Sequence, residues 1–264
     1  FNLQSKVCAA MGVCHSCSPS LLPSLHVKLS PSDVRRSMQT PKYLHYTSSV
    51  DADGPDVKDV WDALTMMDAA MNSDKIVLLY SGYVIAPGER DHEYAAGWNR
   101  EHVWPKSHAA LSTTKPGPGT DIHNLHAADI SVNAERGNKD FDDLTEGHGV
   151  RVVVDSSPPP GYHEMNRLCL VSSDAWEPAD VAKGTVARAL MYMACMYVER
   201  GLRLIEGHTQ NHSMNLGNIV AIKQWAIKFP PSDRELRRNN LAESLQGNRN
   251  PFIDDPQLCL AVQW

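Results

Sequence analysis

The amino-acid sequence predicts an α+β fold, built mainly from helices as a single domain. Apolar residues recur every three or four positions over several long stretches, which is the periodicity of amphipathic helices. Apolar runs of the strand type are few and short. The chain has 264 residues, of which 42% are hydrophobic and 21% are charged, so it can bury a sizeable core. No apolar run approaches the roughly 20 residues of a membrane span, and no membrane partner is expected.

The first 55 residues differ from the rest of the chain in composition. Residues 1–55 are rich in Ser, Pro and Cys with little periodicity, so an irregular segment is expected there, followed by one folded domain over 56–264. The chain begins at Phe1 without a signal-type segment, which indicates a processed or trimmed product. Six cysteines are typical of disulfides in an exported protein. A zinc site at Cys14 and Cys17 stays open, but no second pair follows at zinc-like spacing.

The first half of the expected domain contains two helices, a strand and a loop. A helix is expected from Val60, on the recurrence of Trp61, Leu64, Met67 and Met71. Residues 75–80 (KIVLLY) form a short strand-type run, which Ser81-Gly82 ends. The sequence Lys-Pro-Gly-Pro-Gly indicates a loop over 112–120. A helix is expected over 122–135, on the spacing of Ile122, Leu125, Asp129 and Val132 or Asn133.

The second half adds one strand and three helices. Arg151–Val154 is a strand candidate, closed by the run Pro158–Pro160. A long helix is expected over about 180–199, with one face formed by Val186, Leu190, Met193 and Tyr197. A further helix is expected over about 215–228, before Pro230-Pro231, and another between Ser232 and Gly247.

Two blocks of residues carry the chemistry. Residues 98–108 (WNREHVWPKSH) and 121–141 (DIHNLHAADISVNAERGNKDF) combine His, Asn, Glu and Arg with large apolar residues. Hydrolysis of a phosphodiester requires a deprotonated water, neutralised phosphoryl charge and assistance to the leaving alkoxide. A neutral imidazole supplies the first and a divalent cation the other two. The blocks therefore predict metal-assisted attack on a phosphodiester.

Glu101 and His102 place a carboxylate and an imidazole on adjacent residues. In a strand their side chains point to opposite faces, whereas in a turn both can converge. Mg²⁺ prefers oxygen ligands and keeps much of its water, so two protein oxygens are often enough. A helix that carries Asn133 would bring an amide oxygen to the other side of the ion.

Structural interpretations compete with each of these roles. His123 can link backbone groups, and Asp121 can cap a following helix. Trp98, Trp104 and Leu125 are expected in the core. A zinc site remains an alternative for the four histidines of this region, although thiolate or HExxH spacing is absent; they are His102, His108, His123 and His126.

The net charge of −6 opposes nucleic-acid binding, since phosphate attraction usually comes with a basic surface. A nuclease therefore requires a local basic patch or metal ions on an otherwise acidic body.

The two blocks, taken in order, resemble the endonuclease I family, which contains nonspecific secreted or periplasmic nucleases of the ββα-metal (His-Me finger) class. Two flanking stretches agree with the resemblance. The first consists of VWDAL at 60–64 followed by IVLLYSG at 76–82, and the second is QGNRNPFIDDP at 246–256. The similarity covers about residues 58–258. It implies a ββα-metal motif within a catalytic domain over 56–264, a secreted or periplasmic protein, and a monomer.

The resemblance also implies roles for individual residues. His102 would be the general base, and Glu101 and Asn133 would hold one Mg²⁺, with Mn²⁺ or Ca²⁺ as substitutes. Arg136 would join the catalytic group by contacting a phosphate through both guanidinium nitrogens. Supporting positions would be Asp121, His123 and Asn124. Contacts with the nucleic-acid backbone would come from Arg100, Lys106 and Arg249.

The substrates implied are DNA and also RNA, cleaved with little sequence preference to leave 5′-phosphates. One family feature is missing. The family has a carboxylate or an Arg between the two blocks, whereas the stretch LSTTKPGPG here has Lys115 as its only charge. Two alternatives stay open, namely a zinc phosphodiesterase and an inactive homologue that only binds nucleic acid.

Overall fold

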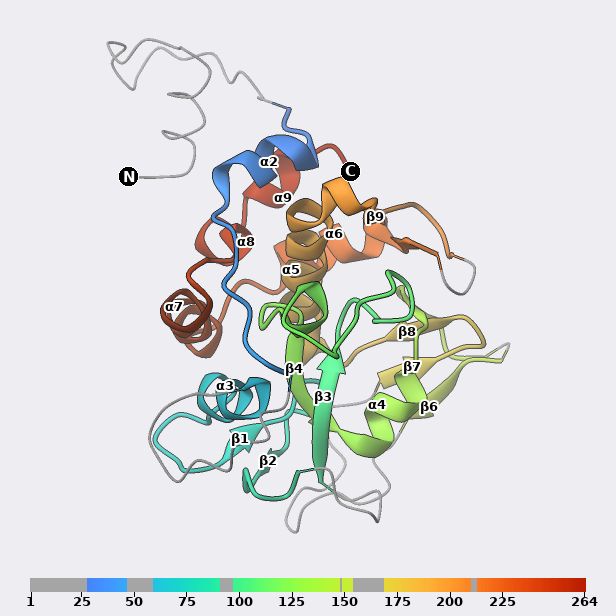
Figure 1. Cartoon of the computed structure of the whole chain (residues 1–264). Helices are drawn as coiled ribbons and strands as arrows, with labels where there is room; N and C mark the ends of the chain where they lie inside the picture. The colour runs from blue at the N-terminus through green and yellow to red at the C-terminus, as the bar shows by residue number, and fades with distance from the viewer. Residues whose placement is uncertain (1–27, 47–58, 91–96, 148, 154–168, 210–212) are drawn as a thin grey trace, which may run out of the picture.

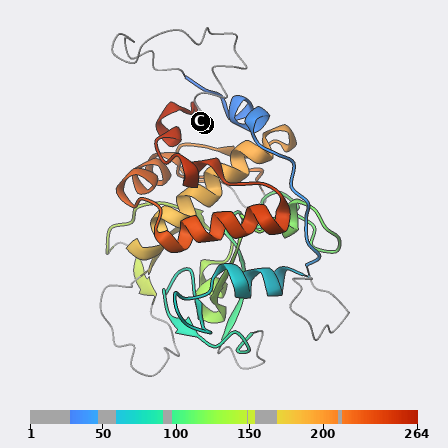
Figure 2. The same ribbon diagram turned by 90° about the vertical axis from the view of Figure 1, so that its left-hand side faces the viewer.

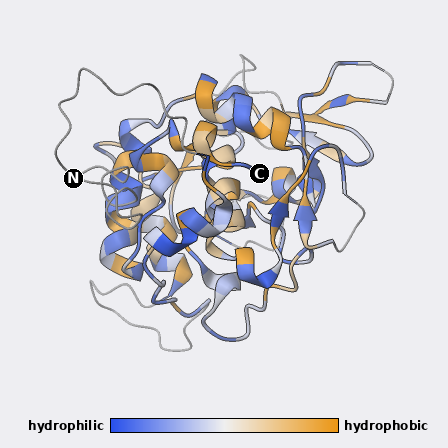
Figure 3. Cartoon of the chain, turned by 90° about the horizontal axis from the view of Figure 1, so that it is seen from above, coloured by the Kyte–Doolittle hydropathy of each residue, from blue (hydrophilic) through white to orange (hydrophobic). Residues whose placement is uncertain are grey.

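The fold is α+β, as the sequence predicts, and helices dominate it (Figure 1). The computed structural model describes residues 28–46, 59–90, 97–147, 149–153, 169–209 and 213–264. Small sheets lie around one long central helix. Hydrophilic and hydrophobic residues alternate along the outer helices, as expected for helices with one buried face (Figure 3). None of the described helices is long and apolar enough to cross a membrane.

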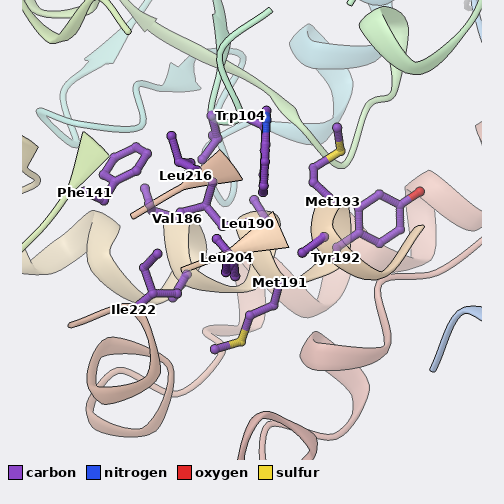
Figure 4. Packing of buried hydrophobic residues seen from close by; sticks show 14 of the residues in the cluster. Trp104, Phe141, Val186, Leu190, Met191, Tyr192, Met193, Leu204, Leu216 and Ile222 are labelled. Carbon is purple, nitrogen blue, oxygen red and sulfur yellow. The ribbon is translucent and has the colours of Figure 1, made fainter. Parts of the chain in front are cut away.

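The main hydrophobic cluster surrounds helix α5 (Asp180–Met196). Helix α5 is buried on nearly all sides, because α6 (Ile219–Lys228), α2 (Pro31–Ser37) and α8 (Pro251–Asp254) all pack against it. Figure 4 shows Leu190 of this helix among Trp104, Phe141 and Ile222. The helix predicted over 180–199 is confirmed, and a 3₁₀ turn, η2 (Val198–Arg200), follows it.

A second hydrophobic cluster lies beneath helix α3 (Val60–Met67). Asp59 caps this helix by accepting the backbone N–H of Trp61 at 2.8 Å. Helix α7 (Asp233–Gln246) packs along α3 (Figure 2). It begins after the cap Ser232 and ends at Gly247 with φ of 81°, which confirms the predicted bounds.

The sheets are short. Four strands pair in the order β5 (Asp140–Phe141), β8 (Ala175–Glu177), β7 (Cys169–Val171) and β6 (Arg151–Val153). Strand β6 confirms the strand predicted at Arg151–Val154. Strand β1 (Ile76–Val77) pairs with β2 (Val84–Ile85), so the run at 75–80 is a shorter strand than its composition indicates. Strands β9 (Arg203–Leu204) and β10 (Asn215–Leu216) are parallel.

A hairpin lies between the two clusters and carries both sequence blocks. Strand β3 (Trp98–His102) pairs antiparallel with β4 (Leu125–Asp129), with Glu101 opposite His126. Helix α4 (Ile130–Arg136) follows β4 directly. The loop between the strands includes a 3₁₀ turn, η1 (Pro118–Thr120). Trp98, Trp104 and Leu125 are fully buried, as predicted.

The helix predicted over 122–135 is wrong for its first half. Every residue of β4 is buried, because one face contacts the α3 cluster and the other the α5 cluster. A strand buried on both faces shows no period of two, so its apolar residues happened to match helical offsets. The helix begins only at Ile130.

Two helix ends also differ from prediction. Helix α6 begins at Ile219 rather than near 215, because Asn215 and Leu216 belong to β10 and Asn218 forms the cap. Helix α3 ends at Met67, and Met71 lies beyond it with 59% of its surface exposed.

The N-terminal range 1–55 contains ordered structure where it is described. Helix α2 packs against α5, and Leu29 pairs with Val262 near the C-terminus. The boundary at residue 55 stays a prediction. Among the described residues, Cys169, Cys195 and Cys259 are buried free thiols. The remaining cysteines, Cys8, Cys14 and Cys17, and the run Pro158–Pro160 lie outside the described residues.

Candidate active site

A cavity of about 460 Å³ opens where strand β3 ends. Strand β3, the turn after it and helix α4 form most of its wall, and Tyr46 and Trp61 complete it. Both sequence blocks therefore meet in one cavity. The lining residues are Tyr46, Trp61, Asn99, Arg100, Glu101, His102, Pro105, Lys106, Ser107, Asn133, Arg136, Gly137 and Asn138.

Glu101 is a buried carboxylate, 2% exposed. Its Oε1 accepts two hydrogen bonds, from the Tyr80 hydroxyl at 2.6 Å and from Nη1 of Arg136 at 3.0 Å. No side chain among the described residues donates to its Oε2. Burial raises the pKa of Glu101, and the guanidinium of Arg136 opposes that shift. The backbone N–H of His102 also favours the charged carboxylate. The side-chain donors thus all bind Oε1, and Glu101 lines the cavity.

His102 is held in one tautomer by a backbone carbonyl. Its Nε2 lies 2.9 Å from the carbonyl oxygen of Gly119. A carbonyl only accepts hydrogen bonds, so Nε2 carries the proton and Nδ1 of the neutral ring is left as the acceptor. Burial, together with the charges of Lys106, Arg100 and Arg136, lowers the pKa of His102 to about 4. The imidazole is therefore neutral near pH 7.

The strand interpretation of Glu101 and His102 is the correct one, yet both side chains line the same cavity. They are the last two residues of β3, where the chain turns away from the sheet. Asn124 supports that turn, because its side-chain oxygen accepts the N–H of Trp104 at 2.7 Å and its Nδ2 donates to the Trp104 carbonyl at 3.1 Å.

Asn133 enters the cavity from the first turns of α4. Its Nδ2 donates to Oδ1 of Asn99 at 2.7 Å, which fixes the amide orientation. The amide oxygen Oδ1 has no hydrogen-bond donor among the described residues. An available carboxylate oxygen and an available amide oxygen therefore face one cavity. This donor set fits Mg²⁺, which takes oxygen ligands and retains several waters.

Arg136 is 1% exposed and bound to the protein rather than free for a substrate. Besides Glu101, its Nη1 reaches the His102 carbonyl at 3.1 Å, and its Nη2 donates to the Val103 carbonyl at 2.7 Å. Its guanidinium also lies over the ring of Phe141 at 4.5 Å. A grip on phosphate through both nitrogens would require these bonds to break, so the geometry favours a role in holding Glu101 and the end of β3.

Of the three basic residues expected to contact the nucleic-acid backbone, two line the cavity and one does not. Arg100 lines the cavity, with its guanidinium between the rings of Tyr46 at 3.5 Å and Trp61 at 4.0 Å. Lys106 is exposed at the rim. These two provide a local basic surface on the acidic chain. Arg249 does not line this cavity, and its guanidinium bonds to Asp254 and Glu243.

Asp121 does not cap a helix, because no helix begins there. Its two oxygens are saturated by buried donors. Oδ1 accepts the N–H of His123 at 2.9 Å and Nε2 of Gln246 at 2.9 Å. Oδ2 accepts the hydroxyls of Tyr192 at 2.8 Å and Tyr197 at 2.5 Å. Asp121 thus ties the hairpin loop to α5 and α7, away from the cavity.

The histidines are not gathered around a common point. Nε2 of His123 bonds to the Asn248 carbonyl at 3.1 Å, which matches the predicted link to backbone. Nδ1 of His108 lies 3.1 Å from the Asn215 carbonyl. Over the described ranges, no three or more His, Cys, Asp or Glu side chains lie where they could hold one metal ion. The geometry therefore disfavours a zinc site built from His102, His108, His123 and His126.

Three residues around the site were not predicted from the sequence. They are Tyr80, which bonds Glu101, Asn99, which orients Asn133, and Gly119, which fixes the His102 tautomer. A Cβ on Gly119 would lie 2.1 Å from the Ser112 carbonyl oxygen, so the loop has no space for a side chain there. One signal was available for Tyr80, because a tyrosine in an apolar run has a hydroxyl that requires a partner.

Comparison with known proteins finds one family and several named relatives. A family model described as Endonuclease I matches residues 45–257. An extracellular ribonuclease of Bacillus amyloliquefaciens is 38% identical over 205 residues, which cover 75% of this chain and 65% of the relative. An extracellular ribonuclease of Bacillus subtilis (strain 168) is 37% identical over 213 residues with the same coverage.

A more distant relative carries a different name. An extracellular deoxyribonuclease of Aeromonas hydrophila is 29% identical over 135 residues, which cover 51% of this chain and 48% of the relative. The chain thus spans 65% of the length of the two Bacillus relatives and less of the Aeromonas one.

Proposed function

The chain belongs to the endonuclease I family, and we propose that it is a divalent-metal-dependent endonuclease that hydrolyses RNA and DNA with little sequence preference. His102 is the general base, and Glu101 and Asn133 hold the ion. The observation that carries the proposal is the pairing of a neutral imidazole, with Nδ1 as its free acceptor, and two available oxygens in one cavity.

The chain's own residues account for the proton transfer. The Gly119 carbonyl holds the proton on Nε2 of His102, so Nδ1 accepts the proton of the attacking water. The low pKa of His102 keeps the ring neutral before each turnover. When bound, Mg²⁺ supplies Lewis-acid stabilisation of phosphoryl charge and of the leaving oxygen. The products carry 5′-phosphate and 3′-hydroxyl ends.

Arg100 and Lys106 supply the cationic contacts with phosphate. Both line the cavity, and Glu101 is the one acidic residue among its described lining residues. Contacts of this kind position a backbone without reading base edges. The net charge of −6 is then compatible with nucleic-acid binding, because the attraction is local.

Both nucleic acids are proposed as substrates on chemical grounds. Attack by an activated water does not use the 2′-hydroxyl of ribose, so the same site acts on either polymer. The names of the relatives support both, since two are called ribonucleases and one a deoxyribonuclease. Those names also support an extracellular location, and we propose secretion and a monomeric state. The unit of β3, β4 and α4 is proposed to be a His-Me finger.

The test uses supercoiled plasmid and a defined RNA, with and without EDTA. We expect cleavage of both, inhibition by EDTA and recovery with Mg²⁺ or Mn²⁺. His102→Ala should reduce cleavage by about 10²- to 10⁴-fold, the range of a lost general base, with little change in melting temperature.

The end groups of the RNA products add a second criterion, since a 2′,3′-cyclic phosphate would show attack by the ribose instead of water. Full activity of His102→Ala would contradict the mechanism. Binding of DNA without cleavage in Mg²⁺ would favour the inactive homologue, and cleavage that depends on stoichiometric tightly bound zinc would favour the zinc phosphodiesterase.

A further inference from the structure

Tyr80 lies outside both sequence blocks, in the turn between β1 and β2, yet it contacts the proposed metal ligand. Its side chain is fully buried. Its hydroxyl donates to Oε1 of Glu101 at 2.6 Å, and its ring packs edge-on against Trp176, with the centroids 5.5 Å apart. A buried hydroxyl bonded to a buried carboxylate makes a short, charge-assisted hydrogen bond.

The residues before and after Tyr80 are both hydrogen-bonded to β4, which fixes the position of the turn. The N–H of Leu79 donates to the Ala127 carbonyl of β4 at 2.8 Å. Ser81 donates through Oγ to Oδ2 of Asp129 at 2.5 Å, at the junction of β4 and α4. The turn that carries Tyr80 is therefore attached to the strand that pairs with β3, where Glu101 resides.

We propose that Tyr80 is a positioning residue of the metal site, which together with Arg136 binds Oε1 of Glu101 and so directs Oε2 to the ion. Both donors converge on the same oxygen, and none among the described side chains reaches the other. A glutamate side chain has three rotatable bonds, and two donors on one oxygen select a single orientation. This inference rests on the proposed role of Glu101.

The chain contains a matched control for this contact. Tyr197 is also buried, and its hydroxyl donates to a buried carboxylate, Oδ2 of Asp121, at 2.5 Å. Tyr80→Phe and Tyr197→Phe each remove one hydroxyl from one buried carboxylate. Only the first of these carboxylates lines the cavity.

The experiment measures the affinity for Mn²⁺ by calorimetric titration of the full chain without nucleic acid. Loss of a group that orients a metal ligand typically weakens metal binding by about 10- to 100-fold, which is the result expected for Tyr80→Phe. Tyr197→Phe should bind Mn²⁺ as the wild type does, even if both variants melt at lower temperature. Equal Mn²⁺ affinity of Tyr80→Phe and the wild type would overturn the inference.

A double-mutant cycle tests whether Tyr80 acts through Glu101. In a Glu101→Gln background, Tyr80→Phe should cause little further loss of Mn²⁺ affinity, since the oriented ligand is already altered. Equal losses in both backgrounds would show that Tyr80 acts by another route and would overturn the inference. If Glu101→Gln alone binds Mn²⁺ normally, the proposed metal site fails and the inference fails with it. A loss in Glu101→Gln without one in Tyr80→Phe rejects the role of Tyr80 alone.

Discussion

Two buried carboxylates in this protein have opposite surroundings. Asp121 receives four hydrogen bonds, two on each oxygen, from α5 and its C-cap Tyr197, from α7 and from its own loop. Glu101 receives two side-chain hydrogen bonds, both on Oε1, and it lines a cavity. Both residues are 2% exposed or less.

Under the proposed function, this difference separates Asp121, a structural acid, from Glu101, a metal ligand. Burial of a carboxylate is costly unless donors or cations compensate for the lost water. The protein compensates fully at Asp121, which connects the hairpin loop to α5 and α7. At Glu101 the compensation is incomplete, and burial raises the pKa. A divalent ion would complete it, so we interpret the incomplete set of donors as a mark of the site.

Glu101→Gln should have the largest effect, and the effect should be on activity. Gln keeps an acceptor oxygen for Tyr80 and Arg136 but removes the buried counter-charge of Arg136, so the free energy of unfolding should fall by about 3 kcal/mol. Cleavage of plasmid DNA should fall on the order of 10³-fold, because a metal contributes several kcal/mol to such a reaction. Nicking assays measure the loss of cleavage, and thermal melts measure the change in stability. A large loss of stability with activity retained would reverse the assignment of the two acids.

Asp121→Asn is the counterpart and should act on stability. One carboxylate oxygen becomes an NH₂ group that faces donors, so about two charge-assisted hydrogen bonds are lost. We expect a loss of about 3 kcal/mol in the free energy of unfolding. Urea denaturation measures it. Cleavage at low temperature should stay within a few-fold of wild type, since Asp121 does not line the cavity. A variant that is stable but inactive would place Asp121 in the catalytic machinery.

The smallest predicted effect per residue concerns pH, and it is shared by both regions. Burial lowers the pKa of His102 near the cavity, of His123 beside Asp121, and of His126 in β4. Below pH 6.5 the histidines of the unfolded chain bind protons, whereas the buried rings of the folded protein stay neutral. Stability is therefore complete above pH 6.5 and decreases as pH falls toward the folded pKa values, by about 1.4 kcal/mol per pH unit for each ring.

His126→Gln isolates one of these contributions. The slope of unfolding free energy against pH between 6.5 and 5 should decrease by about one proton, or about 1.4 kcal/mol per pH unit. Urea titrations at several pH values measure the slope. An unchanged slope would show that His126 is already protonated in the folded protein. In that case burial alone would not explain why the rings of His102 and His123 are neutral.

Much of the fold follows from local pattern, as α7 shows. Its cap Ser232 and its terminal Gly247 are chemical signals that act within a few residues, so both of its bounds were predictable. Strand β4 could not be predicted as a strand from local pattern. Its burial on both faces results from the clusters around α3 and α5, which are distant in the sequence.

The residues of the site likewise fall into those that local sequence predicts and those that depend on long-range contacts. Glu101, His102 and Asn133 could be predicted because they fall in two compact blocks, and the structure brings them to one cavity. Tyr80, Asn99 and Gly119 act through single long-range contacts. Arg136 was recognised, but its contacts with Glu101 and with the carbonyls of His102 and Val103 depend on tertiary packing.

A crystal structure of the protein soaked in Mn²⁺, with an anomalous difference map, would locate the proposed metal ion and identify its ligands. We expect one strong peak in the cavity, within bonding distance of Oε2 of Glu101 and Oδ1 of Asn133, with His102 nearby but not bound to the ion. A peak coordinated by histidine ring nitrogens, or a cavity without a peak at saturating Mn²⁺, would contradict it.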